Sequence, residues 1–452
     1  MRGQDASGLL EISAISDTNR CASGSARRIK ALRMATAGIA KSVEAGLLPD
    51  SGRRRAGAQG FQHRPLRIGI DATCWRMRRG FGRHARCLLG AMLEVDPGNE
   101  YLFFIDSDEV AGELPSDVRT RVVGPSTPSS RSGARRPRDL LRAAMAMSAA
   151  PLDVIVFPAI YSYVPVFSRA RKIVMVHDTT ADEYPEFALH SRCARVLWSL
   201  KGMLARRQAD ALLAVSEYAR SQIVRRFALP DDRIGIVGEA PDRRFRVLPR
   251  PLVPTDTLRQ LGFHPENRAI VYVGGFSPHK NLASLVQAFA HIASDGRYGA
   301  VKLFLVGDHD HDSFFSCYLR VKEEVAAMGL EGRVIFTGYL PDDDLVVLLN
   351  LAEMLVLPSM NEGFGLPAAE AAACGCPVVA TTASPLRSIL GDAMLPIDPR
   401  SEAQLRDAII AVLSSGALRE RMRAAGPLAA ARLSWEEEAR RLLAIIAAVA
   451  SR

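Results

Sequence analysis

The residues best suited to chemistry lie in a glycine-rich segment around position 365. Two glutamates, Glu362 and Glu370, flank the run Gly-Phe-Gly-Leu-Pro that ends at Pro367. Proline is favoured in the first turn of a helix, so the segment is predicted to lead into a helix that Gly375 ends. The free N–H groups and the dipole of that helix would form an anion site suited to a diphosphate. One carboxylate could bind ribose hydroxyls and the other hexose hydroxyls; a solvated loop with a capping glutamate is the alternative.

A second segment combines two glycines with a lysine. The apolar run Ile270–Val273 leads into Gly274 and Gly275, and Lys280 stands just ahead of a helical pattern. Glycine lets the backbone approach a phosphate, and lysine supplies a positive charge. We therefore predict a second phosphate contact at Lys280; a surface lysine is the alternative.

Two more motifs follow apolar runs in the first half of the chain. His177 ends the run Ile173–His177 and Asp178 follows it, at the carboxyl edge where active sites of parallel sheets form. A strand-end histidine is, however, often structural. Gly82 and Arg83 lie where a helix is predicted to begin. The glycine motif that starts at Gly80 lies too far beyond the first strand to be a dinucleotide fingerprint. The next residue, His84, is expected on that helix's surface.

The elements that position these motifs alternate in type along the chain. Short apolar runs, separated by helical patterns, predict two α/β domains with parallel sheets covered on both faces. A proline-rich stretch at residues 249–254 divides them. The first series comprises Arg67–Asp71, Tyr101–Ile105, Arg121–Val123, Val154–Phe157, Ile173–His177, Ala211–Val215 and Ile234–Val237; the second comprises Ile270–Val273, Val301–Val306, Val334–Thr337, Met354–Leu357, Pro377–Ala380 and Met394–Ile397.

Composition sets further limits on the function. The 452 residues carry a net charge of +9, concentrated in the first 55 residues and between Arg131 and Arg142. Such clusters attract phosphates, nucleic acid or anionic lipid, or are simply solvated. No apolar run approaches the roughly 20 residues of a membrane span, and no export signal is recognisable, so we expect a cytoplasmic protein. The seven cysteines show no zinc pattern, and Asp308 to Asp312 is expected to be an exposed polar loop rather than a metal site.

The spacing of Glu362 and Glu370 resembles the E-x7-E signature of the retaining glycosyltransferases of family 4, also called group 1. The resemblance extends from Leu66 to the C-terminus and implies the GT-B fold, two Rossmann-like domains facing a central cleft. It implies an acceptor domain at residues 65–250, a donor domain at 251–430 and a terminal helix at 434–450 that packs back toward the first domain. Residues 1–64 are predicted to be a disordered extension.

The same resemblance assigns roles to the candidate residues. It implies that Glu370 binds the nucleotide ribose and that Glu362 lies at the donor sugar. It implies that His177 contacts the sugar and that Asp178 orients the acceptor. Many family members have arginine where this chain has Gly275, so one cation is missing there; Arg83 or helix N-terminal amides would have to compensate. The remaining donor contacts implied by the resemblance are Gly82, Gly274, Lys280, Gly363, Phe364, Gly365 and Leu366.

The resemblance thus implies a retaining transferase that needs no metal or cofactor besides its nucleotide diphosphate sugar. The form Ser277-Pro-His-Lys-Asn281 resembles members that use GDP-mannose, which favours mannose among the hexoses. The expected acceptor is a saccharide or lipid-linked saccharide, as in cell-surface polysaccharide or lipopolysaccharide synthesis. The basic cluster would add peripheral contact with the inner face of an anionic membrane, and no nucleic acid is expected as a partner. A nucleotide-sugar epimerase of the same fold and a non-catalytic protein that binds anionic ligands are the alternatives.

Overall fold

The computed structural model describes residues 64–452 except 78, 79, 117, 125–136, 189, 190, 265 and 310–315. The predicted extension therefore lies outside the described residues, apart from residue 64. The same holds for most of the arginines between Arg131 and Arg142 and for the second half of the polar loop after Asp308.

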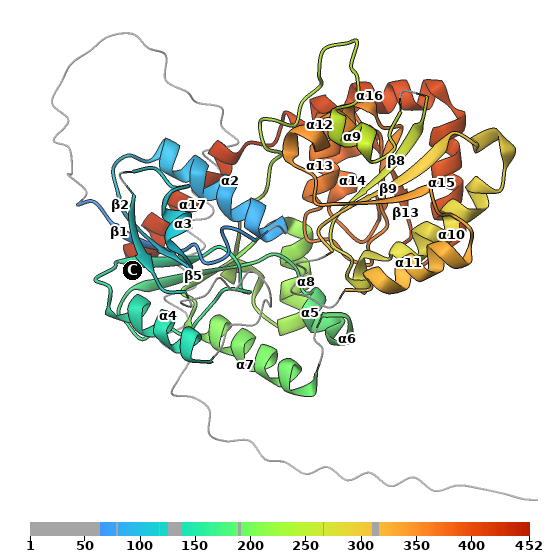
Figure 1. Cartoon of the computed structure of the whole chain (residues 1–452). Helices are drawn as coiled ribbons and strands as arrows, with labels where there is room; N and C mark the ends of the chain where they lie inside the picture. The colour runs from blue at the N-terminus through green and yellow to red at the C-terminus, as the bar shows by residue number, and fades with distance from the viewer. Residues whose placement is uncertain are drawn as a thin grey trace, which may run out of the picture. The chain divides into compact units, whose positions relative to one another are not determined.

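The first half of the described chain, coloured blue to green in Figure 1, builds a sheet. This sheet has seven strands in the order β3-β2-β1-β4-β5-β6-β7. Every neighbouring pair is parallel. The central strands are buried along their length because helices cover both faces of the sheet, which requires near-continuous apolar runs. The strands are β1 (Arg67–Asp71), β2 (Glu100–Ile105), β3 (Arg119–Val122), β4 (Val154–Phe157), β5 (Arg171–Val176), β6 (Ala211–Ala214) and β7 (Ile234–Ile236).

The second half builds a six-stranded parallel sheet in the order β10-β9-β8-β11-β12-β13. Its strands are β8 (Arg268–Val273), β9 (Val301–Val306), β10 (Val334–Gly338), β11 (Met354–Leu357), β12 (Val378–Thr381) and β13 (Met394–Ile397). The strands in both sheets match the predicted runs, with ends shifted by at most two residues. The prediction of two Rossmann-like parallel-sheet domains is confirmed.

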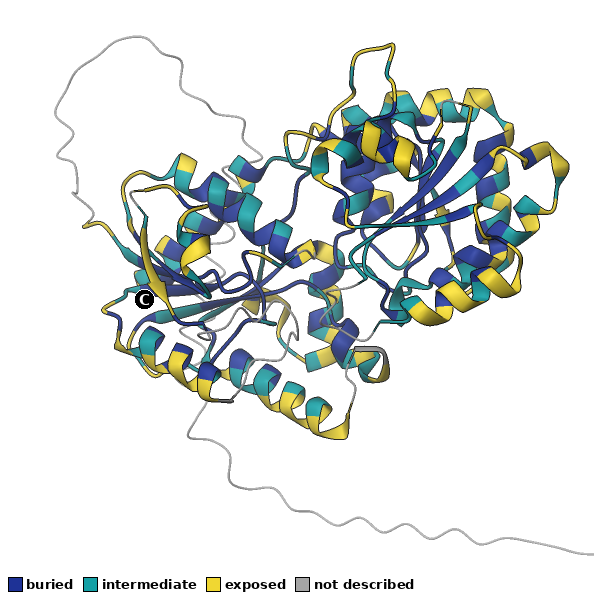
Figure 2. Ribbon diagram, in the orientation of Figure 1, coloured by how far each residue is buried: buried dark blue, intermediate teal, exposed yellow. Residues whose placement is uncertain are grey.

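Helices connect the strands of each sheet, and one side of most of them is exposed (Figure 2). In the first half they are α2 (Gly80–Val95), α3 (Asp108–Ala111), α4 (Pro137–Ala149), α5 (Thr180–Glu183), α6 (Pro185–Ala188), α7 (Arg192–Gln208) and α8 (Glu217–Phe227). In the second half they are α9 (Asp256–Gln260), α10 (Leu282–Ala293), α11 (Tyr318–Ala327), α12 (Asp342–Leu351), α13 (Leu366–Ala373), α14 (Leu386–Leu390), α15 (Glu402–Ser414), α16 (Gly416–Ala430) and α17 (Trp435–Ala450). Short 3₁₀ turns are η2 (Asp231–Arg233), η3 (Pro278–Lys280), η4 (Gly296–Tyr298) and η5 (Gly391–Ala393).

The last helix, α17, joins the core of the first sheet although it follows the second sheet in sequence. Ser434 caps it by accepting a hydrogen bond from the N–H of Glu437. Its buried stripe, which includes Leu442 and Ile446, packs with residues of α2, β4 and β5. A carboxylate of α17, on Glu438, also accepts a 2.6 Å hydrogen bond from the N–H of Gly238, just after β7. The C-terminal helix therefore fixes the loop that follows the edge strand of the first sheet.

Within the described ranges, every helix is too short or too polar to span a lipid bilayer.

Candidate active site

The glycine-rich segment forms a tight loop between β11 and α13. Gly365 caps the helix with φ of +89°, a backbone conformation that a side chain would strain. Pro367 lies in the first turn, and the helix ends at Ala373 ahead of Gly375, whose φ is +70°. Both local predictions are confirmed, and the first N–H groups of α13 are left at the loop as expected for an anion site.

This loop touches the carboxyl edge of the other sheet. A Cβ built on Gly363 would lie 1.9 Å from the carbonyl oxygen of His177, so only glycine allows the observed approach. The hydroxyl of Ser216, which follows β6, donates a 2.5 Å hydrogen bond to the carbonyl of Gly363. The same hydroxyl accepts a hydrogen bond from the N–H of Ala219 and so caps α8. Strand ends of the first sheet therefore meet the loop of the second sheet directly.

The two predicted donor segments converge. The Nζ of Lys280 lies 2.7 Å from a carboxylate oxygen of Glu362, and both side chains are largely buried. Two hydrogen bonds hold the segments together: the N–H of Met360 donates to the carbonyl of His279, and the side-chain amide of Asn281 donates to the carbonyl of Pro358. The lysine and the glutamate thus belong to one site, where each neutralises the other's charge.

Arg83 reaches the second glutamate of the signature. Its guanidinium donates a 2.8 Å hydrogen bond to Glu370 and also pairs with Asp342. Glu370 is 2% exposed, and this burial outweighs the attraction of Arg83 and raises the carboxyl pKa to about 7. The arginine considered as a substitute for the cation missing at Gly275 therefore lies at the carboxylate predicted to bind ribose.

The remaining predicted contacts are placed as follows. Gly274 and Gly275 form the half-buried turn after β8, where the hydroxyl of Tyr272 donates to the carbonyl of Gly275. Gly82 is buried in the first turn of α2. Asp178 uses one carboxylate oxygen locally, to accept a 2.8 Å hydrogen bond from the N–H of Thr180. Phe364 and Leu366 are buried in the core of the first sheet. These contacts do not test the roles predicted for these residues, which stay predictions.

The expectation for His84 is wrong. Its side chain is completely buried, because α17 covers this part of α2 and places Trp435 5.4 Å from the imidazole, centroid to centroid. The His84 ring also lies edge to face with the ring of His177, at 4.6 Å. The spacing of apolar residues along α2 alone does not show that a C-terminal helix closes over this position.

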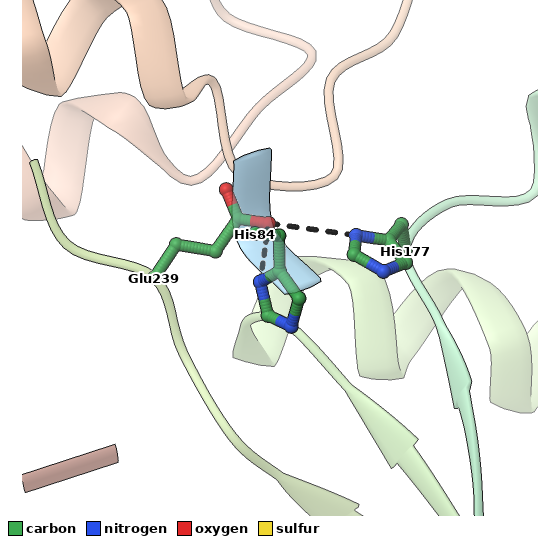
Figure 3. A group of neighbouring side chains, drawn as sticks. All are labelled: His84, His177 and Glu239. Carbon is green, nitrogen blue, oxygen red and sulfur yellow. Dashed lines mark ion pairs between the residues drawn. The ribbon is translucent and has the colours of Figure 1, made fainter. Parts of the chain in front are cut away.

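Glu239 is the site residue that the sequence reasoning missed. It follows β7, and one of its carboxylate oxygens lies 3.1 Å from Nδ1 of His84 and 3.4 Å from Nδ1 of His177 (Figure 3). All three side chains are buried. An acidic residue just beyond the carboxyl end of a strand, at the same edge as His177, was the available signal.

This trio also offers ligand atoms for a metal. Among the described residues, His84, His177 and Glu239 are the one group of three or more such side chains whose ligand atoms all lie within 4.8 Å of one another. Imidazole and carboxylate are ligands that zinc accepts. The prediction that the protein needs no metal stays a prediction.

Comparison with known proteins places the chain in a family. Residues 79–242 match the model described as Glycosyltransferase Family 4, and residues 255–428 match the model described as Glycosyl transferases group 1. The chain is 32% identical over 268 residues to the O-antigen chain mannosyltransferase B of Escherichia coli, covering 59% of this chain and 67% of that protein. This chain is a family 4 glycosyltransferase. The family 4 enzyme is also 29% identical over 237 residues to the serotype-specific mannosyltransferase WbdA of Escherichia coli, where the match spans 51% of this chain but 28% of the relative.

Solved structures of low sequence identity share its fold. WaaG, a glycosyltransferase involved in lipopolysaccharide biosynthesis, has a TM-score of 0.67 at 14% identity, over 84% of this chain and 99% of that one. Anabaena HepE in complex with UDP-glucose has a TM-score of 0.62 at 17% identity, over 85% of this chain and 100% of that one. These likenesses confirm the GT-B fold.

Proposed function

We propose that this family 4 enzyme transfers a hexose, with mannose favoured, from a nucleotide diphosphate sugar to a saccharide or lipid-linked saccharide, with retention of anomeric configuration. The convergence of Lys280 and Glu362 at the N-terminus of α13 carries the proposal. A cation and free helix amides at one point suit the negative charge that grows on a leaving diphosphate. The names of its relatives support mannose and a role in cell-surface polysaccharide synthesis.

The charged pairs suggest how the donor binds. The diphosphate takes Lys280 from Glu362, which frees that carboxylate for the hydroxyls of the sugar. The ribose hydroxyls take the place of Arg83 on Glu370, and Arg83 keeps Asp342 as a partner. Each donor contact thus replaces a contact within the protein, so the two buried carboxylates keep hydrogen-bond partners when they give up their cations. The leaving diphosphate accepts the acceptor's proton as the new bond forms on the same face of the sugar.

A donor panel tests the proposal. Release of nucleoside diphosphate from GDP-mannose, UDP-glucose and other sugar nucleotides is measured with and without a lipid-linked saccharide fraction. We expect acceptor-dependent release with one donor and a fall of about 10²- to 10³-fold in Lys280→Ala and Glu362→Ala, the range seen when one stabilising group is removed from a site of developing charge. Lys322→Ala, at an exposed lysine on α11, is the matched control. Release that needs no acceptor and yields an isomerised sugar would favour an epimerase instead.

We also propose that the enzyme contacts an anionic membrane through α4. This helix exposes Leu141 and Met145 beside Arg138 and Arg142, and Phe167 next to it is 78% exposed. Exposed apolar side chains among arginines suit the interface of an anionic bilayer.

Flotation with phosphatidylglycerol vesicles at low and high salt tests the membrane contact. We expect salt-sensitive flotation that is lost in Leu141→Glu but kept in Leu319→Glu, at an even more exposed leucine on α11 of the other half. Equal flotation of the two variants, or no flotation of the unchanged protein, would contradict the proposed membrane contact.

A further inference from the structure

Two histidines and a glutamate form a buried group at the carboxyl edge of the first sheet. His84 comes from α2, His177 directly follows β5 and Glu239 lies in the segment after β7 (Figure 3). Their side chains are 0%, 10% and 7% exposed. Imidazole and carboxylate together are a common ligand set for a divalent transition metal, so we asked whether the geometry suits an ion.

The distances within this group match those between ligands of one ion. The same carboxylate oxygen of Glu239, Oε1, lies 3.1 Å from Nδ1 of His84 and 3.4 Å from Nδ1 of His177. Zinc lies about 2.0–2.1 Å from such ligand atoms, and tetrahedral geometry then sets neighbouring ligand atoms about 3.3 Å apart. One ligand atom from each residue lies within 4.8 Å of the other two. The three atoms are thus close enough to share a single ion.

His84 shows the need for a ligand most directly. Its side chain is completely buried, and neither ring nitrogen has a hydrogen-bond partner among the described residues. Burying a polar group without a hydrogen bond costs stability, so a native fold seldom leaves such an atom without a ligand. Its Nδ1 is directed at the carboxylate of Glu239 (Figure 3). An ion bound between these two atoms satisfies both.

The second imidazole is oriented as metal ligands are. Nε2 of His177 lies 2.8 Å from the carbonyl oxygen of Pro158, which can only accept a hydrogen bond, so Nε2 carries a proton. In the neutral ring Nδ1 then has a free lone pair, and it faces the carboxylate of Glu239, which is also an acceptor when ionised. A histidine that binds a metal through one nitrogen commonly donates the other N–H to a backbone carbonyl, which fixes the ring. A cation between the two acceptors makes their contact attractive.

The neighbouring segments hold the group in place. Trp435 of α17 lies edge to face with His84, with 5.4 Å between the ring centroids. The N–H of Gly238 donates a 2.6 Å hydrogen bond to Glu438 of α17, which fixes the segment that carries Glu239. The slight exposure of His177 and Glu239 gives a water molecule access as the fourth ligand of a tetrahedral ion.

We propose that His84, His177 and Glu239 bind one divalent transition-metal ion, for which zinc is the best match. The ion joins α2, the end of β5 and the segment after β7. It also fixes the backbone of His177, whose carbonyl packs on Gly363 of the loop between β11 and α13. The ion takes no part in the contacts proposed above for the diphosphate and the sugar, so this inference does not depend on the proposed function.

The first test measures the metal content of the untagged protein. The protein is stripped with EDTA, reloaded with zinc and desalted, and its zinc is measured by mass spectrometry. We expect about one zinc per chain, and less than about a tenth of that in Glu239→Gln, which keeps the side chain's shape but removes the anionic ligand. His291→Asn is the matched control and should keep the ion, because His291 is an exposed histidine of α10 that faces Glu402. Unchanged protein that takes up no zinc, or equal zinc in Glu239→Gln, would overturn the proposal.

The second test reads the coordination of the ion. Cobalt bound in place of zinc absorbs visible light much more strongly at a four-coordinate site than as the six-coordinate aqueous ion. We expect this strong absorption in the unchanged protein and its loss in His84→Phe, which keeps the bulk of the ring. A spectrum like that of the aqueous ion would contradict a site built from these three side chains.

The third test reads stability, and it needs no variant. Adding zinc to the stripped, unchanged protein should raise its unfolding temperature by about 5 °C or more, because the ion binds the folded chain in preference to the unfolded one. EDTA should reverse the rise, and no change on adding zinc would contradict the proposal. If Glu239→Gln and His84→Phe do not fold, the zinc content, the cobalt spectrum and this rise in the unchanged protein decide together. Zinc-loaded protein without transferase activity would sink the proposed function and leave the metal site standing.

Discussion

A methyl group added at position 363 tests whether the donor loop, the glycine-rich loop between β11 and α13, must touch the end of β5. A Cβ on Gly363 would lie 1.9 Å from the carbonyl oxygen of His177 and 2.9 Å from its carbonyl carbon. Real Cβ atoms essentially never approach other atoms closer than 3.0 Å. In Gly363→Ala the loop and the strand end must therefore separate by at least about 1 Å, and both are backbone that cannot rotate away.

The size of the effect follows from that displacement. Overpacking a tight contact costs about 1–3 kcal/mol of unfolding free energy. A displacement of about 1 Å at the donor should lower kcat/KM about 100-fold. Urea unfolding and nucleoside diphosphate release measure the two quantities. Gly80→Ala, at the start of α2, is the matched control, since a Cβ there meets no described atom within 4 Å. A Gly363→Ala enzyme within about threefold of the unchanged one would refute the claim that this contact positions the donor loop.

Three further changes test the charge and packing of the molecule. The unfolding free energy of Glu370→Gln, minus that of the unchanged protein, should increase as pH rises from 5 to 8. Burial raises the carboxyl pKa from 4.5 to about 7, so the stability linked to its neutral form is complete below pH 4.5 and is lost as pH rises through 7, by about 3 kcal/mol at most; a difference that stays flat with pH contradicts this. Leu442→Ala should cost about 2–5 kcal/mol in urea unfolding because Leu442 is fully buried, whereas Leu428→Ala, 73% exposed, should change little; equal losses would show that α17 is not anchored as described. Gly90→Ala, within α2 with open space for its Cβ, should raise the unfolding free energy by about 0.5–1 kcal/mol, and a decrease would be the contrary result.

The sequence by itself determined the strands, their parallel arrangement in two sheets and the form of the donor loop. These features depend on local chemistry: continuous apolar runs require sheets covered on both faces, and Pro367 and Gly375 mark the start and end of a helix. The convergence of Lys280 and Glu362 was also expected, because both follow strands whose carboxyl ends share one edge of a sheet.

Tertiary structure alone decided which charges pair and which side chains are buried. Arg83 and Glu370 are 287 residues apart in sequence, and their contact exists because the tertiary fold brings the first turn of α2 within reach of α13. His84 is buried because α17, from the far end of the chain, closes over α2. Glu239 lies against two histidines that come from other elements. A side chain's ionisation and accessibility depend on neighbours within a few ångströms, and those neighbours come from segments whose packing no local pattern specifies.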